Sequence, residues 1–500
     1  MYHKVKISLL FIMMSCLLLS GASIANRALS FTSMPFSTQE LTMIKQYLFN
    51  NITTKDRIVI KEGDHRIIRS IPGAVLASPS NKYGTFTQDY QFHWVRDAAI
   101  TMNEVVYLYA QGSVDEKKSL RPYLINYVSF EHKAQQQIAQ SSQPLGEPKY
   151  NIDGTVWEGA WGRPQNDGPA LRAITLMMIA HLFLQENDEK FVRENLFNMI
   201  ILDLDYIVSK WRETSFDLWE EVNDQDLFFT KMVQRKALVE GADFVRNIIG
   251  DYQRADFYLS VANQLTNSLQ KHWNPGRGYF TETVNQQFYK GGGINSSIIL
   301  GILHGNLGDA DDPFAFNNDR VMSTIYFLRN SFSGLYRINI NNRTYPPLIG
   351  RYPNDVYDGD QSVYGNPWIL TSSGLAQYYY ALANFYLKQH EIKVTKENFL
   401  FFEQINPTLF NTKEEVITLT NNPGKFYAAI NSLVSEGDKI LQLIKRFGMC
   451  YTDYSCNHYA EQIDRTSGAQ TSAKDLTWGY ASLLTAMQTR YMLDDGLSQK

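Results

Sequence analysis

The chain has 500 residues, of which 44% are hydrophobic and 20% charged, and its formal net charge is -4. This composition predicts a soluble globular protein with a large core, and it lacks the basic excess typical of nucleic-acid binding. Aromatic residues make up 13% of the chain; most of them are needed to fill such a core, and the rest can stack on flat ligands such as sugars.

Residues 1–25 have the three parts of a secretory signal peptide. A basic start is followed by an apolar run, 7–20, and by small residues that include Ser23 and Ala25 before the expected cleavage point. The apolar run is too short to span a bilayer, so a retained membrane anchor is the weaker alternative. We therefore predict a secreted, extracellular protein with no membrane attachment after cleavage.

Cysteine usage is compatible with export. Cys16 lies inside the expected signal peptide, which leaves Cys450 and Cys456 in the mature chain. A close pair of cysteines in an exported protein can form a disulfide, and two free thiols are the alternative.

Long amphipathic helices dominate the pattern of the mature chain. Residues 168–185 place Leu171, Ile174, Met178 and Leu182 on one stripe, as one face of a helix requires. The same periodicity recurs at 252–272, 376–390 and 479–492, whereas strand-like alternation is confined to short pieces such as 278–289 and 335–340.

The chain length alone would suggest about three domains, but no linker-like or low-complexity stretch divides it. We therefore predict one catalytic domain over residues 26–500, built as a helical bundle or toroid whose loops carry the functional groups. Residues 26–71 are interpreted as an N-terminal extension that packs on this body.

Residues 216–241 contain the strongest candidate for chemistry. Asp217, Glu220 and Glu221 crowd three carboxyl groups beside Trp219. Such crowding against an apolar ring raises a carboxyl pKa toward the range of a general acid at neutral pH. The alternative is the solvated acidic first turn of an ordinary helix. Because adjacent residues of a helix face different directions, only one of Glu220 and Glu221 is expected to act on the bond while the other binds substrate.

Four further loops combine aromatic rings with charged side chains, and two of them, 150–169 and 350–355, also contain glycine. Residues 89–97 bring together Tyr90, Trp94, Arg96 and Asp97, a set suited to a polyol, although an Arg–Asp pair at a helix start is an equally good reading. The other three loops are 150–169, with Trp161; 350–355, with Arg351; and 458–464, with Glu461. Each of these loops precedes or follows a helical stretch.

The sequence shows no metal-ligand spacing, no phosphate-binding glycine loop and no serine nucleophile elbow. Carboxylates are therefore the predicted catalytic groups, and no cofactor or metal is expected.

Six motifs stand out along the chain: WVRDAA at 94–99, WGRPQNDGPALRA at 161–173, DLWEEVN at 217–223, QRKALVEG at 234–241, GRYPND at 350–355 and SAKDLTW at 472–478. They resemble the motifs of the glucoamylases, the glucan 1,4-alpha-glucosidases of glycoside hydrolase family fifteen. The motifs occur in the family's order across most of residues 75–490. The chain departs from the family at Gln88, where many relatives have proline, and it shows no starch-binding module, so tight binding to raw starch is not expected.

The resemblance implies an all-α fold, the α/α toroid or six-hairpin barrel of paired helices, with short β pieces in the loops. It implies that Glu220 is the general acid and Glu461 the general base. Asp217 is sometimes given as the base in this family; Glu461 is preferred because carboxyl groups three residues apart on a helix lie closer than the ~6.5 to 9.5 Å that inversion requires. The implied substrate-binding residues are Tyr90, Trp94, Arg96, Asp97, Trp161, Trp219, Glu221 and Arg351.

The implied activity is hydrolysis of α-1,4-glucans from the non-reducing end by a secreted enzyme that we expect to be a monomer. Starch, maltodextrins and related glucans are the predicted substrates, and β-D-glucose is the predicted product. Two alternatives remain: a related α-glucosidase that acts on isomaltose, dextran or trehalose linkages, and a non-catalytic secreted glucan-binding protein. The intact carboxylate positions favour an enzyme.

Overall fold

The computed structural model describes residues 33–55, 57–60, 67–80, 88–137, 144–360, 363–451 and 455–498. The predicted signal peptide, 1–25, and Cys16 lie outside the described residues, as does the first part of the predicted N-terminal extension.

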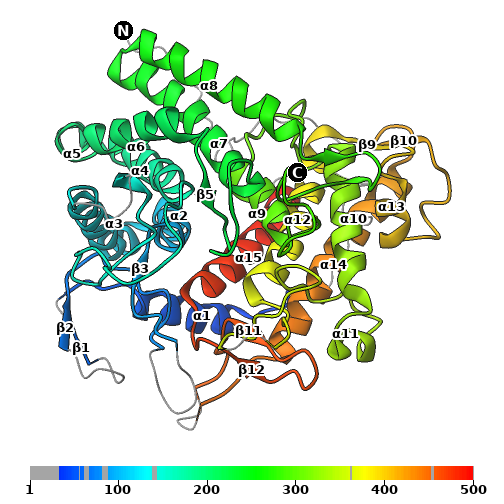
Figure 1. Cartoon of the computed structure of the whole chain (residues 1–500). Coiled ribbons are helices and arrows are strands. Elements are labelled where there is room, and N and C mark those ends of the chain that lie inside the picture. Colours follow the sequence, from blue (N-terminus) through cyan, green and yellow to red (C-terminus); the bar gives the residue numbers. More distant parts are fainter. Residues whose placement is uncertain are drawn as a thin grey trace.

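Six helices form a closed inner ring. They are α2 (Val95–Gln111), α4 (Gly168–Gln185), α7 (Phe228–Phe244), α9 (Ser296–Gly305), α12 (Ile369–Gln389) and α15 (Thr477–Ser498). Each helix packs against the next in this order, and α15 packs against α2, which closes the ring. In Figure 1, α15 (red) runs through the middle of the molecule.

A second set of helices packs on the outside of this ring. They are α1 (Thr38–Asn50) on α15, α3 (Val114–Gln135) on α2, α6 (Phe197–Lys210) on α4, α8 (Tyr252–Gln270) on α7 and α14 (Pro423–Arg446) on α12. The remaining helices are α5 (Glu189–Asn195), α10 (Asp319–Ser333), α11 (Arg337–Asn341) and α13 (Phe399–Ile405), with a 3-10 turn at Pro144–Gly146 and a π turn at Val245–Ile249. Paired inner and outer helices make the fold an α/α toroid, as predicted.

In the described part of the chain, strands are short and occur as six antiparallel pairs in the loops. The pairs are β1 (Arg57–Ile60) with β2 (Ile67–Ser70), β3 (His93–Trp94) with β4 (Lys149–Tyr150), β5 (Ser215–Phe216) with β6 (Asn223–Asp224), β7 (Trp273–Asn274) with β8 (Tyr279–Phe280), β9 (Glu391–Val394) with β10 (Glu415–Thr418), and β11 (Gln462–Ile463) with β12 (Gln470–Thr471). Three of these pairs flank the candidate site: β3–β4, β5–β6 and β11–β12.

The inner helix α4 illustrates why the ring forms. It is buried on almost all sides, because it contacts α2, α7 and α6 at once. Of the predicted stripe, Leu171, Ile174 and Leu182 are buried, while Met178 is only partly buried. By length and composition α4 could cross a bilayer, but 78% of it is buried inside the protein, as expected for a core helix.

The helical predictions agree with the structure better than the strand predictions. Residues 252–272 correspond to α8, 376–390 to the last two thirds of α12, and 479–492 to most of α15. Within 278–289 only Tyr279–Phe280 is a strand. The strand predicted at 335–340 is wrong, since Arg337–Asn341 is a helical turn.

Asn339 explains the failed strand prediction. Its side-chain amide donates to the carbonyls of Phe332 and Leu348, at 3.0 and 2.8 Å, and its oxygen accepts from the amide of Leu348. These bonds satisfy a buried polar side chain and fold the backbone into a compact turn. A six-residue stretch of apolar and polar residues cannot distinguish such a turn from a strand.

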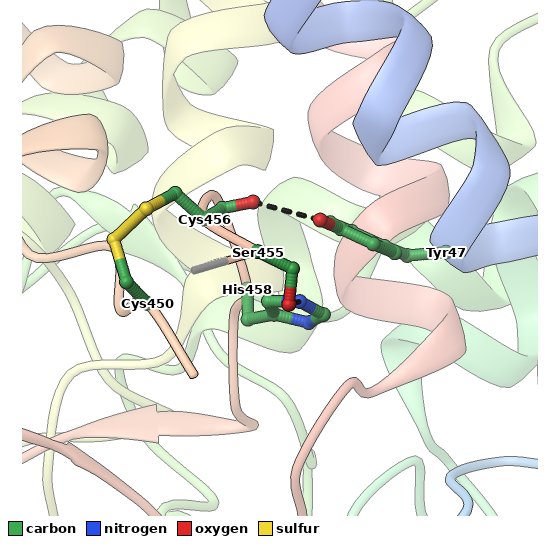
Figure 2. The surroundings of a disulfide bond; sticks show 5 residues. All are labelled: Tyr47, Cys450, Ser455, Cys456 and His458. Carbon is green, nitrogen blue, oxygen red and sulfur yellow. Dashed lines mark hydrogen bonds between the residues drawn. A yellow bond between two sulfur atoms is a disulfide. The ribbon is translucent and has the colours of Figure 1, made fainter. Parts of the chain in front are cut away.

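Cys450 and Cys456 form a disulfide, which confirms the predicted pairing over two free thiols. Figure 2 shows the bond beside Tyr47 of α1 and His458. The backbones of Met449 and His458 pair with each other next to it. The disulfide therefore closes a small loop directly before the segment that carries Glu461.

Candidate active site

The candidate site is a cavity at the end of the toroid where the inner helices begin. Trp94, Trp368 and Asn295 are the N-cap residues of α2, α12 and α9. The cavity has a volume of about 340 Å³. The structure brings together at its wall all of the predicted site residues except Asp217: Tyr90, Trp94, Arg96, Asp97, Trp161, Trp219, Glu220, Glu221, Arg351 and Glu461.

Glu220 lies in the turn between β5 and β6, not on a helix. Its φ angle is +64°, in the left-handed region that non-glycine residues rarely adopt. Its Oε1 accepts from the indole Nε1 of Trp94 at 2.9 Å, from Nε2 of Gln165 at 3.0 Å and from Nη2 of Arg96 at 3.4 Å. Since these donors all meet Oε1, Oε2 is the oxygen that can carry a proton toward a substrate.

Glu461 reaches the cavity from the loop before β11. Its Oε1 accepts from the hydroxyl of Tyr90 at 3.0 Å, and its Oε2 accepts from the hydroxyl of Ser472 at 2.5 Å and from Nε2 of Gln462 at 3.0 Å. Its side chain is 3% exposed. Burial raises the pKa of Glu461 above its usual range, and the three hydrogen bonds, which favour the charged form, oppose that rise.

Asp217 is not brought to the cavity wall. Its Oδ1 accepts from the backbone amides of Glu221 and Val222, at 2.7 and 2.8 Å, and its side chain is 1% exposed. Burial raises the pKa of this carboxyl to about 6. Through these two bonds, Asp217 stabilises the turn that presents Glu220 and Glu221.

The turn conformation also corrects the predicted separation of carboxyl groups. The sequence reading placed Asp217 and Glu220 on one helix, whereas residues 217–222 form the β5–β6 connection and the helix begins only at Phe228. The amide of Glu220 donates to the carbonyl of Asp217 at 2.9 Å, as in a tight turn. The helical spacing therefore does not apply to this pair.

Arg96 and Asp97 occupy the first turn of α2. Arg96 donates through Nη1 to Gln165 and to Asp167, both at 2.9 Å, and its Nε lies 3.5 Å from Asp97. Burial raises the pKa of Asp97 to about 7, against the opposing charge of Arg96. The predicted Arg–Asp pair at a helix start exists, and it also faces the cavity.

Arg351 and Glu221 form the opposite wall. Arg351 makes a bidentate pair with Asp355, at 2.8 and 2.6 Å, and donates to Oε1 of Glu221 at 3.1 Å. The hydroxyl of Tyr352 donates to Oε2 of Glu221 at 2.5 Å. Glu220 is thus held by Trp94, Gln165 and Arg96. Glu221 is held by Arg351 and Tyr352. The two adjacent carboxylates therefore belong to different parts of the cavity wall.

Aromatic rings form much of the remaining wall. The indole of Trp219 donates to Oδ1 of Asn295 at 2.9 Å. Trp161 is 38% exposed, and its ring meets Trp94 edge to face with centroids 6.1 Å apart. The ammonium of Lys149 lies 3.2 Å from the centroid of Trp161.

Sequence reasoning missed several residues of the site. Tyr357, Trp368 and Trp478 line the cavity, and Gln165, Asp167 and Ser472 hold its charged groups. Gln165, Asp167, Ser472 and Trp478 lie inside motifs that the sequence displays. Their position inside these motifs is therefore the sequence signal that could have identified them as site residues.

Among the described residues, no cluster of three His, Cys, Asp or Glu could hold a metal ion.

The sequence profile of the family described as "Glycosyl hydrolases family 15" matches residues 58–488. The chain belongs to glycoside hydrolase family 15. Among curated relatives, it is 32% identical to "Glucoamylase" of Blastobotrys adeninivorans over 91% of this chain and 71% of the relative. It is 34% identical to "Glucoamylase 1" of Rhizopus oryzae over 87% of this chain and 71% of the relative.

Solved structures agree with the family 15 assignment. The glucoamylase of Saccharomycopsis fibuligera matches with a TM-score of 0.76 and 29% identity, over 94% of this chain and 99% of that structure. The family 15 glucoamylase of Hypocrea jecorina matches with a TM-score of 0.79 and 30% identity, over 91% of this chain and 72% of that structure. This family 15 protein is a glycoside hydrolase of the glucoamylase type.

The compartment is not fixed by family membership. A relative from Saccharomyces cerevisiae, 28% identical over 84% of this chain and 79% of the relative, is named "Glucoamylase, intracellular sporulation-specific". Secretion of the present family 15 enzyme has to be argued from its own sequence.

Proposed function

We propose that this enzyme is exo-acting and inverting, and that it releases β-D-glucose from the non-reducing ends of starch, maltodextrins and related α-1,4-glucans. The observation that carries the proposal is the placement of Glu220 and Glu461 on one small cavity from two separate segments of the chain. Glu220 is the general acid that protonates the leaving oxygen. Glu461 is the general base that activates a water on the opposite face of the sugar.

The hydrogen bonds of the two carboxyl groups support these roles. Glu220 is anchored through Oε1, which leaves Oε2 as its proton-bearing oxygen. Glu461 accepts from three donors, Tyr90, Ser472 and Gln462, and such donors favour the ionised form that a base requires. Glu220 thus has one oxygen turned to the substrate for proton transfer, and Glu461 has donors that stabilise its carboxylate form.

The walls of the cavity support exo-action. A volume of about 340 Å³ is at the small end of ligand pockets and suits the end of a chain. Arg96 and Asp97 on one side, and Glu221 and Arg351 on the other, supply fixed donors and acceptors for sugar hydroxyls. Trp161 is the most exposed ring of the wall and is placed to stack on a sugar further from the scissile bond.

The stereochemistry of the first product tests the proposal. We expect proton NMR in the first minutes of maltose hydrolysis, before mutarotation, to show β-glucose, since a single displacement by water inverts the anomeric centre. Initial α-glucose would overturn both the inverting mechanism and the role of Glu461.

The linkage preference is the second part of the proposal. We expect glucose release from maltose to exceed release from isomaltose and from trehalose when all three are measured side by side at equal concentration. A higher rate on isomaltose or trehalose would assign the enzyme to one of the related α-glucosidases.

We also propose that the enzyme is secreted, acts without a membrane and is a monomer. The signal-like residues 1–25 and the Cys450–Cys456 disulfide support export, because disulfides persist in oxidising compartments. N-terminal sequencing of protein from the culture medium is expected to start near Asn26. Light scattering of the same sample is expected to give the mass of one chain.

Ser472 provides a test of the base. The Ser472→Ala change removes a donor to Oε2 of Glu461, so the pKa of Glu461 rises further. Because a base must be deprotonated, activity is lost as the pH falls through this pKa, and a higher pKa moves the acid limb to higher pH. We expect a shift of about 0.5 to 1 pH unit in the acid limb of kcat/KM, on the scale of one hydrogen bond. An unchanged acid limb would contradict the assignment.

A further inference from the structure

His458 lies in an aromatic clamp next to the disulfide. Its ring stacks on Tyr47 of α1, with centroids 3.9 Å apart, and on Tyr451 at 4.0 Å. Figure 2 shows the ring of Tyr47 beside His458, with its hydroxyl bonded to the carbonyl of Cys456 at 2.9 Å. The Cys450–Cys456 bond closes the loop that carries Tyr451. The clamp thus fixes the imidazole from two sides.

The clamped ring bonds to Asp475. Nδ1 of His458 lies 2.7 Å from Oδ1 of Asp475, and Nε2 lies 3.0 Å from the hydroxyl of Ser455. An ionised carboxylate is only an acceptor, so Nδ1 carries the hydrogen in this pair. Asp475 also accepts from the hydroxyls of Tyr451 and Tyr480.

The His458–Asp475 pair joins the two segments that form the base. Glu461 lies three residues after His458, and Ser472 lies three residues before Asp475. The two segments run side by side, since the amide of Glu461 donates to the carbonyl of Ala473 at 2.8 Å and β11 pairs with β12.

The segment that carries Ser472 has an unfavourable backbone. Ser472 has φ of +71° and Asp475 has φ of +50°, both in the left-handed region. Non-glycine residues in this region cost free energy and persist only where surrounding contacts hold them. The contacts of Asp475 with His458 are among those that hold this turn.

We propose that His458 is a positioning residue for the general base. Through Asp475 it holds the 472–475 turn so that the hydroxyl of Ser472 stays on Oε2 of Glu461. The inference rests on the proposed role of Glu461, and it adds that α1 and the disulfide-closed loop, both outside the cavity, set the geometry of that group.

The test is a double-mutant cycle of His458→Ala and Ser472→Ala, measured as pH profiles of kcat/KM on maltose. In the single variant His458→Ala we expect the acid limb to move up by about half a pH unit, with kcat lowered about fivefold at the wild-type optimum and KM almost unchanged. In the Ser472→Ala background, His458→Ala should shift the acid limb no further, because its effect acts through the hydroxyl that is missing. Equal shifts in both backgrounds would overturn the proposal.

Two further variants separate positioning from folding. His458→Asn keeps a donor near the position of Nδ1 and should restore most of the wild-type pH profile. His181→Ala removes a histidine of α4 that packs edge to face on Phe244, away from the cavity, and should lower the thermal midpoint without moving the acid limb. An acid limb that moves in His181→Ala, or that fails to recover in His458→Asn, would indicate a general loss of packing.

The same experiment distinguishes failure of the inference from failure of the proposed function. If Glu461→Ala retains wild-type activity, the base has been assigned wrongly. If Glu461→Ala is inactive while His458→Ala has the wild-type pH profile, the base stands and only the positioning role of His458 is refuted.

Discussion

Glu220→Gln is expected to lower kcat on maltose by about 10²- to 10⁴-fold, the usual contribution of a positioned general acid. The amide is nearly isosteric with the carboxyl group, and its oxygen can still accept from Trp94 and Gln165, so the fold and the binding of sugar should be retained. The measurement is steady-state hydrolysis together with the thermal midpoint and glucose binding by calorimetry. Near wild-type turnover would remove Glu220 from the role of acid.

The matched control is Glu221→Gln, the same change at the adjacent residue. Glu221 is held by Arg351 and Tyr352 on the other wall, so it contributes through substrate hydroxyls. We expect a raised KM and a smaller fall in kcat than in Glu220→Gln. Equal effects of the two changes would contradict the assignment of the two carboxylates to different walls.

The position of the cavity opposes part of the effect of burial, which raises the pKa of Asp97 and of Glu461. It lies at the N-terminal ends of the inner helices, where backbone N–H groups carry partial positive charge. Arg96 and Arg351 each contribute a full positive charge inside this ring. The helix ends and the two guanidinium groups therefore offset part of the negative charge that the carboxyl groups gather around Glu461, the proposed base.

Periodicity was sufficient to predict the helices and insufficient to predict the loops. Inner helices such as α4 have long runs of apolar residues with helical periodicity, and these residues are buried in the folded chain. The segment of Asp217, Glu220 and Glu221 has no such pattern, and its expected helical geometry rests only on the assumption of helix spacing between neighbouring carboxyl groups. The turn forms instead because Asp217 bonds to two backbone amides of its own loop.

Residues of the cavity wall are easier to predict from the sequence than the residues that hold them in place. Glu220 lies inside DLWEEVN and Glu461 lies shortly before SAKDLTW, and the resemblance supplies an expected role for each of them. Asp167 and Ser472 are in motifs as well, yet their value comes from contacts with Arg96 and Glu461, which are distant in sequence. Contacts across more than ten residues follow from the fold and cannot be deduced from the spacing of residue types.

Glu461→Ala is expected to lower kcat by about 10²- to 10⁴-fold, because no group then removes a proton from the attacking water. The change shortens a buried side chain, so it opens space beside Tyr90 and Ser472 on the face where water attacks. A small anionic nucleophile can enter that space and needs no base. Added azide is therefore expected to restore part of the activity.

The configuration of the azide product identifies the face of attack, which the rate of the reaction does not. A nitrogen of azide forms the bond to the anomeric carbon while the bond to the leaving oxygen breaks and Glu220 supplies its proton. Attack from the face of the missing base yields β-glucosyl azide from an α-linked substrate, which NMR and mass spectrometry identify. The double variant Glu220→Gln, Glu461→Ala should gain nothing from azide on maltose, since its leaving group still needs the acid. Recovery without any glucosyl azide, or formation of the α-azide, would refute Glu461 as the base of an inverting mechanism.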